Sequence, residues 1–168
     1  AIILVAAIAA GVLIQTASSL QNKALLTGER SKSQVSTSLS PMLAYAEDGG
    51  TNNNVEKFFL KVKLVPGSDP IRFKDMLMEF SLKNTSDDLV YNSSVTECNE
   101  TNGSKTSYGV EYLIKGDNHD SGYLQRGDVV KICFESSRAV EEDETISITM
   151  IPKIGNPSTI STALPDII

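Results

Sequence analysis

The sequence predicts an α+β protein, in which a long, apolar N-terminal helix precedes an all-β domain built as an immunoglobulin-like sandwich. Residues 1–22 of the 168 contain no charged side chain, and residues 1–14 are apolar apart from one glycine. After residue 39 the apolar residues alternate with polar ones, as in half-buried strands. Turn residues separate about six to eight such strands. We therefore expect a helix over residues 1–37 and a β-sandwich domain over residues 38–168.

The first 22 residues are predicted to be helical because Ala, Leu and Ile dominate them and no proline precedes Pro41. A helix that is apolar on every side has to be buried all round, in a membrane or among other helices. At the usual helical rise these residues would span about 33 Å, close to the thickness of a bilayer core. Polar residues from Gln15 to Asn22 make the second half poorly suited to permanent membrane residence.

Small residues are concentrated within the apolar stretch, at Ala6, Ala7, Ala9, Ala10 and Gly11. Small side chains let helix backbones approach one another closely. This favours a helix that waits in a membrane and then packs with copies of itself. Three alternatives remain: a permanent membrane anchor, a remnant of a signal peptide, which lacks the usual basic region, and a buried core helix of a globular protein.

The helix is expected to continue to about Ser36, a length of about 54 Å. An intermittent apolar face persists beyond Leu20, and Gly28 weakens the helix without ending it. Pro41 cannot continue the hydrogen-bond ladder, so the helix ends or kinks before it.

Strands are predicted wherever polar and apolar residues alternate between turn signals. The clearest is Phe58–Val65, in which Leu60, Val62 and Leu64 alternate with two lysines. The others span residues 40–46, 76–82, 89–95, 109–115, 128–134 and 146–151. Residues 47–54, 116–122 and 141–144 read as turns, residues 71–76 as a short connector, and the tail after Pro152 as an edge strand or arm.

Charge and cysteine content bear on the partners and the compartment of the chain. The net charge of −6 argues against nucleic-acid binding, which requires a basic face. Cys98 and Cys133 could form a disulfide worth roughly 4 kcal/mol in the chain-entropy model, as an oxidising compartment would favour. Two buried free thiols are the alternative.

Four N-glycosylation sequons begin at Asn84, Asn92, Asn99 and Asn102. Their clustering in a region rich in Ser, Thr and Asn favours a secreted, glycan-coated surface. A polar loop cluster that merely satisfies the pattern is the alternative.

The sequence offers little for catalysis, and we expect neither a metal nor a cofactor. His119 is the single histidine, so Ser-His-Asp triads and multi-histidine metal sites are not available in their usual form. A Cys–His pair with Cys98 or Cys133 is formally possible, although a surface-loop histidine is the simpler interpretation. Residues 117–122 resemble a calcium loop but lack its final acidic ligand. Residues 141–144 are expected to form a solvated acidic turn.

Three segments of the sequence resemble archaellins, the filament subunits of the archaeal swimming organelle, the archaellum. Residues 4–24 are very similar to the archaellin helix, residues 65–76 to the opening of the second strand of its outer domain, and residues 149–168 to its C-terminus with a Pro-Lys-x-Gly turn. Archaellins usually carry a few more Gly-rich and apolar residues before the matching stretch, including the cleavage context of a prepilin-type peptidase.

The resemblance implies a structural, non-enzymatic subunit that self-assembles into an extracellular cell-surface filament rotated for swimming. The expected partners are copies of the chain and paralogous archaellins, a membrane before assembly, and the archaellum motor and assembly machinery. The helix would form the filament core, with packing residues Ile3, Val5, Ala6, Ala7, Ala9, Ala10, Gly11, Val12 and Ile14. An adhesive type IV pilin and a membrane-anchored enzyme are the alternatives.

Overall fold

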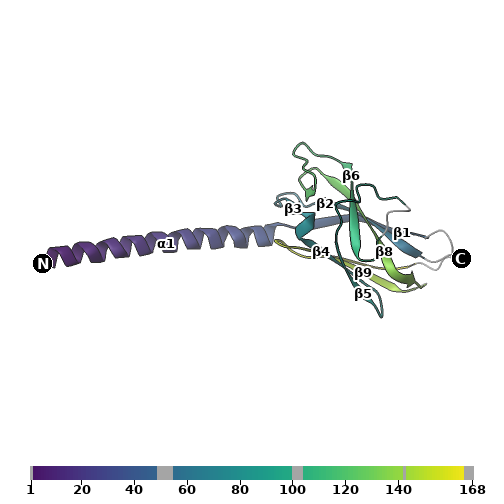
Figure 1. Ribbon diagram of the computed structural model, residues 1–168, viewed down its shortest axis with the longest axis horizontal. Coiled ribbons are helices and arrows are strands. Elements are labelled where there is room, and N and C mark those ends of the chain that lie inside the picture. Colours follow the sequence, from purple (N-terminus) through teal and green to yellow (C-terminus); the bar gives the residue numbers. More distant parts are fainter. Residues whose placement is uncertain (1, 49–54, 100–103, 142, 165–168) are drawn as a thin grey trace.

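A long helix projects as a rod from one end of a β-rich domain in the computed structural model (Figure 1). The structure describes residues 2–48, 55–99, 104–141 and 143–164. Helix α1 spans Ile2–Ser36, 35 residues, and is therefore about 52 Å long. The helix and its end before Pro41 confirm the prediction, apart from residue 1, which lies outside the described residues.

The rest of the described chain consists of short strands. They are β1 (Leu39–Asp48), β2 (Val55–Leu64), β3 (Ile71–Arg72), β4 (Met76–Ser81), β5 (Ser86–Tyr91), β6 (Ser107–Ile114), β7 (Tyr123–Leu124), β8 (Val129–Val140), β9 (Thr145–Pro152) and β10 (Ser158–Ala163). A single 3-10 turn, η1 (Phe73–Asp75), separates β3 from β4 in this part of the chain.

Eight strands form one nearly closed sheet, in the order β1-β2-β8-β6-β5-β4-β9-β10. Neighbouring strands are antiparallel except β5 and β6, which pair in parallel. A parallel backbone bridge between Ser38 and Asn156 joins the two segments that lead into the edge strands β1 and β10. Strands β3 and β7 form a separate two-stranded sheet. A β-rich domain after the helix is thus confirmed, and its main sheet is nearly closed.

The core lies between the two halves of this sheet. The aromatic ring of Phe58 on β2 lies 4.9 Å from that of Phe80 on β4, and Phe80 lies 5.1 Å from Phe134 on β8. Aromatic pairs at these distances add stability beyond their buried area. Tyr108 on β6 is fully buried, and its hydroxyl lies 2.9 Å from the carbonyl oxygen of Phe73. Burial raises the pKa of this phenol above its ordinary value.

Most strand predictions differ from the structure in their limits; β1, for example, extends to Asp48, into residues expected to form a turn. Two of them show the reason. The strand expected at residues 89–95 is β5, which begins at Ser86 and ends at Tyr91. Pairing of Asp88 with Glu79 on β4 extends this strand into a polar stretch without alternation, and a turn that begins at Asn92 ends it. β8 continues six residues beyond the expected end at Phe134, to Val140. In both cases cross-strand pairing outweighs the local pattern.

Candidate functional site

Helix α1 buries none of its residues in its own chain, although its first half is strongly apolar. None of its residues is buried, and side chains as large as Ile3 and Ile14 are 85% and 68% exposed. Among the described residues, α1 is the helix whose length and composition would let it cross a membrane. A single soluble chain would therefore leave a large apolar surface in water, which marks an interaction site.

The nine residues predicted to pack in a filament core all lie on this exposed part of α1. They are Ile3, Val5, Ala6, Ala7, Ala9, Ala10, Gly11, Val12 and Ile14. At Gly11 an added Cβ would meet no atom within 4 Å, and the same holds for Gly28 in the charged half of the helix. Nothing within the single chain therefore requires a glycine at position 11.

One polar side chain of the helix, that of Thr16, forms a hydrogen bond with the helix backbone. The Thr16 hydroxyl donates a hydrogen bond of 2.8 Å to the carbonyl oxygen of Val12, one turn earlier. This bond lowers the cost of moving the hydroxyl out of water. The apolar surface can therefore extend to Thr16 when the helix is placed in a dry environment.

The junction between helix and domain is held by hydrogen bonds from two separate loops. On one side, the Ser68 hydroxyl accepts a bond of 3.0 Å from the Ser38 amide and lies 3.2 Å from the Ser36 carbonyl oxygen. The Asp69 amide donates to the Thr37 hydroxyl at 3.3 Å. Thr37 is only 1% exposed, so the residue after the helix is embedded in the domain.

On the other side, the turn between β9 and β10 caps the end of the helix. The Asn156 amide donates to the Thr37 carbonyl oxygen at 2.9 Å, and its side-chain Nδ2 donates to the Val35 carbonyl at 3.1 Å. Gly155 has a φ of 123°, and a Cβ there would lie 2.7 Å from the Thr37 carbonyl oxygen. Carbonyl groups at a helix end otherwise lack partners, so this turn satisfies them and fixes the direction of α1.

Sequence reasoning missed Thr37, Ser68 and Asn156. Each is a small polar residue beside a turn, and such residues are common wherever loops occur. The Pro-Lys-x-Gly turn at residues 152–155 carries part of the family resemblance, but nothing in its local sequence indicates a contact with the helix.

Three of the four sequon asparagines are among the described residues, and each lies outside the strands. Asn84 is exposed in the turn between β4 and β5, and Asn99 is exposed in the segment after β5. Asn92 is partly buried, and its Oδ1 accepts a bond of 3.0 Å from the Ser94 amide. Asn102 lies outside the described residues.

Cys98 and Cys133 are joined in a disulfide, so neither offers a thiol to His119. With Phe59 they form a small second core, against which Tyr45 and Val95 pack. Lys131 pairs with Glu111 at 2.7 Å and donates to the Cys98 carbonyl at 3.0 Å. Desolvation by burial would raise the pKa of Glu111, but hydrogen bonds from Lys131 and the Cys98 amide bring it below its ordinary value. The Cys98 segment is thus anchored to the outside of the sheet.

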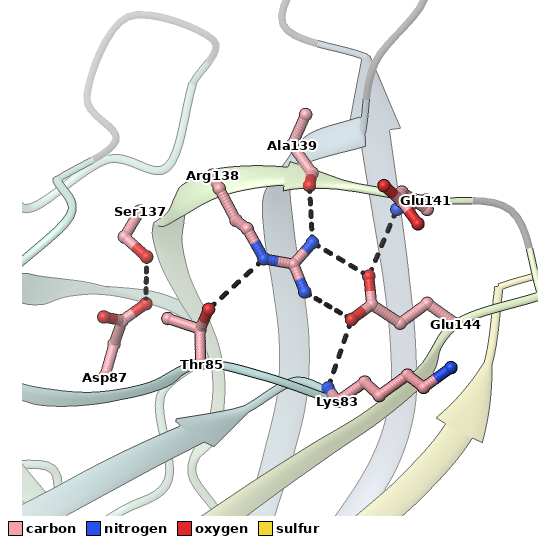
Figure 2. A network of polar contacts seen from close by, with 8 residues as sticks. All are labelled: Lys83, Thr85, Asp87, Ser137, Arg138, Ala139, Glu141 and Glu144. Atoms are coloured by element: carbon pink, nitrogen blue, oxygen red, sulfur yellow. Dashed lines mark hydrogen bonds and ion pairs between the residues drawn. The ribbon is translucent and has the colours of Figure 1, made fainter.

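Figure 2 shows a polar network centred on the carboxylate of Glu144. Arg138 binds both of its oxygens through two guanidinium nitrogens, and the amides of Lys83 and Glu141 donate to it at 3.1 and 3.2 Å. These bonds, that from Arg138 first, hold the pKa of the Glu144 carboxyl below its ordinary value despite burial. The expectation that residues 141–144 form a merely solvated turn is therefore wrong for Glu144, whose side chain is only 5% exposed.

The loop at residues 117–122, whose sequence resembles a calcium loop without its final acidic ligand, is organised by a carboxylate outside it. Asp128 accepts the Gly116 amide at 2.8 Å and the Gln125 amide at 3.1 Å. His119 packs its ring 4.4 Å from that of Tyr112 and places Nδ1 3.6 Å from Asp128, so it is partly buried rather than a free surface histidine. No group of three or more His, Cys, Asp or Glu side chains suited to a metal occurs among the described residues.

Comparison with known proteins agrees with this geometry. The sequence model of the archaeal-type flagellin family matches residues 1–162. Flagellin A1 of Haloferax volcanii is 35% identical over 130 residues, covering 76% of this chain and 58% of that protein. Flagellin A2 of Halobacterium salinarum is 33% identical over 174 residues, covering 99% of this chain and 83% of that protein.

Among solved structures, the archaeal flagellum of Methanospirillum hungatei has the same fold. Its subunit superposes with a TM-score of 0.72 at 15% identity, covering 99% of this chain and 88% of that one. The superposition thus includes both the helix and the β domain of this chain. The family model and these relatives favour a filament subunit over the enzyme alternative, and no observation favours the adhesive pilin. The chain belongs to the archaeal-type flagellin family, whose members are structural subunits of the archaellum filament on the outside of archaeal cells.

Proposed function

We propose that the chain builds the archaellum by packing α1 against the α1 helices of identical and paralogous subunits. The observation that carries this proposal is that no residue of α1 is buried in its own chain, although its first half is apolar. Each Ile, Leu or Val side chain moved from water to a dry helix interface contributes roughly 1.5–3 kcal/mol. Several such residues per subunit outweigh the loss of translational and rotational freedom on association.

Before assembly the membrane provides the dry environment. Residues 2–22 carry no charge, and the first charged side chain along α1 is Lys23. The helix therefore waits in the bilayer, and the assembly machinery transfers it to the growing filament. Polar residues in its second half, including Gln15 and Gln21, make the transfer out of the bilayer less costly than it would be for a permanent anchor.

The junction supports the transmission of torque. Thr37 is held by the loop that carries Asp69 and by the turn that carries Asn156. Two independent sets of hydrogen bonds resist bending of the helix relative to the domain. When a motor turns the core of helices, the outer domains follow it.

We further propose a division into a core helix at residues 1–37 and an outer domain at residues 38–168. In this arrangement Asn84, Asn92, Asn99 and Asn102 carry glycans, and the Cys98–Cys133 bond forms outside the cell. The two facing halves of the nearly closed sheet support an immunoglobulin-like sandwich as a description of the outer domain. No catalytic step is required of the subunit.

Deletion of the coding sequence, with complementation, tests the function. We expect the deletion strain to lack filaments in negative-stain micrographs and to stop swimming, and the complemented strain to recover both. Loss of surface attachment with intact swimming would contradict the proposal and favour an adhesive pilin. Intact-mass measurement of purified filaments checks the glycans and the disulfide independently.

A further inference from the structure

Outward-facing charged residues on the two halves of the β domain differ in sign at two places, on β2 and on the β4–β5 pair. On the β2 side, Lys61 lies opposite Leu43 of β1, and Lys63 lies opposite Val129 of β8. We call these four residues the lysine face. On the other side, Glu79 of β4 lies opposite Asp88 of β5, and Leu77 of β4 lies opposite Ile151 of β9. We call these four residues the acidic face.

The register places both sets of side chains outward. Phe58, Leu60 and Val62 of β2 are buried, so the alternating Lys61 and Lys63 point away from the core. Met76, Met78 and Phe80 of β4 are buried in the same way, so Leu77 and Glu79 point outward. Because the core lies between the two halves, the two faces look in opposite directions.

The lysine face is unusual in a chain with a net charge of −6. Lys131, the next lysine on the same surface, is neutralised by Glu111 at 2.7 Å. Lys61 and Lys63 have no ion pair within the described residues. Unpaired lysines on an acidic protein attract acidic surfaces, including those of other copies.

Apolar side chains accompany the charges on both faces. Leu43 is 49% exposed on the lysine face, and Leu77 and Ile151 are 36% and 37% exposed on the acidic face. Charged groups around apolar contacts are the common composition of a protein–protein interface.

We propose that the lysine face of one subunit binds the acidic face of a neighbouring copy in the filament. The contact is heterologous, joining two different faces of the same polypeptide. A heterologous contact repeated with a rotation that does not close generates an open helical fibre. It would repeat with the same helical symmetry as the packing of α1, and it rests on the proposed filament function. Asn92 is the residue after β5 and lies two positions beyond the exposed Val90, so a glycan there would border the acidic face and limit the contact in that direction.

Charge reversal in filaments tests the contact. The Lys61→Glu/Lys63→Glu variant and the Glu79→Lys/Asp88→Lys variant each replace two attractions by repulsions. We expect each to raise the concentration of unassembled subunit on the order of tenfold, and the effect to shrink at high salt. The quadruple variant restores the attraction and should return close to the wild-type value. The Lys74→Glu/Arg126→Glu variant makes the same change in net charge as the lysine-face variant, at exposed residues that belong to neither face, and should leave assembly unchanged.

Cross-linking gives a second readout that does not depend on stability. Filaments containing Leu43→Cys and Leu77→Cys subunits should yield dimers between the two variants with a short bis-maleimide, and few dimers within either one.

Three results would overturn the inference and leave the filament function standing: double variants that assemble like wild type, a quadruple variant no better than either double, or cross-links mainly within one variant. Lysine-face variants that assemble normally but lose binding to an anionic polysaccharide would assign that face to another acidic partner. Absence of filaments from the wild-type chain would instead contradict the function itself.

Discussion

Replacing Gly11 by leucine separates the needs of the filament from those of the single chain. A Cβ at this position meets no atom within 4 Å in the isolated subunit, so the Gly11→Leu variant introduces no clash within the chain. Leucine also favours the helix over glycine by about 0.7 kcal/mol. This gain applies equally to the helix in the membrane and in the filament, and cancels from the assembly equilibrium.

The filament is where the variant should fail. If α1 backbones approach closely around the small residues at positions 6–11, a leucine forces the helices apart at every subunit. Overpacking of this kind costs about 1–3 kcal/mol per site. The concentration of free subunit at equilibrium then rises about 5- to 150-fold.

Gly28→Leu is the matched control. Gly28 lies on the same helix with the same open surroundings, but among the charged residues Glu29, Arg30 and Lys32. We expect few or no filaments from the Gly11→Leu strain by negative-stain microscopy, although circular dichroism should show that its β domain is still folded. The Gly28→Leu strain should form normal filaments. Normal filament number and length in the Gly11→Leu strain would refute close packing of the helices at this position.

Three further predictions concern the outer domain and its junction. Glu144→Gln should lower the free energy of unfolding at pH 7 by roughly 1–3 kcal/mol. Because the pKa of Glu144 is depressed from its ordinary value of 4.5, the carboxylate's contribution is fully present above that pH and is lost as the pH falls through the folded-state pKa. Urea unfolding followed by tyrosine fluorescence should therefore give equal free energies of unfolding for wild type and variant in acid, and a difference that persists there would exclude linkage to this carboxyl. Cys98→Ser/Cys133→Ser should lower the free energy of unfolding by roughly 2–4 kcal/mol. In the same urea measurement, a reducing agent should lower the unfolding midpoint of the wild type and leave that of the variant unchanged. Gly155→Ala should speed hydrogen exchange at the Thr37 and Asn156 amides because its Cβ meets the Thr37 carbonyl oxygen. Gly122→Ala, at a φ of 85° with open space around it and outside the two loops that hold the junction, should leave these amides protected. Equal exchange in the two variants would contradict a specific contact at the junction.

Local signals were sufficient to predict some elements and insufficient for others. Helix α1 could be predicted because its composition is uniform over many turns and Pro41 limits it. The alternation of Leu60, Val62 and Leu64 identified β2. β5 begins in a polar stretch that is extended only because it pairs with β4, and no pattern within residues 86–88 records that pairing.

The same distinction holds for the candidate site. The role of α1 can be predicted from composition, because a helix whose first half is uncharged and apolar on every side is stable only in a membrane or among packed helices. Glu144 depends on Arg138 and on backbone amides brought to it by the sheet, and Asn156 contacts Val35 across a sequence separation of 121 residues. A polar side chain in a turn has the same local sequence whether it faces water or holds the end of a helix.

A helical reconstruction of native filaments by electron cryomicroscopy would test the central claim most directly. We expect residues 3–14 of α1 to lie in a continuous bundle on the filament axis, with Gly11 at a close helix crossing and the β domains outside. A filament whose subunits are joined only through their β domains, with α1 exposed or folded back onto its own domain, would contradict the account.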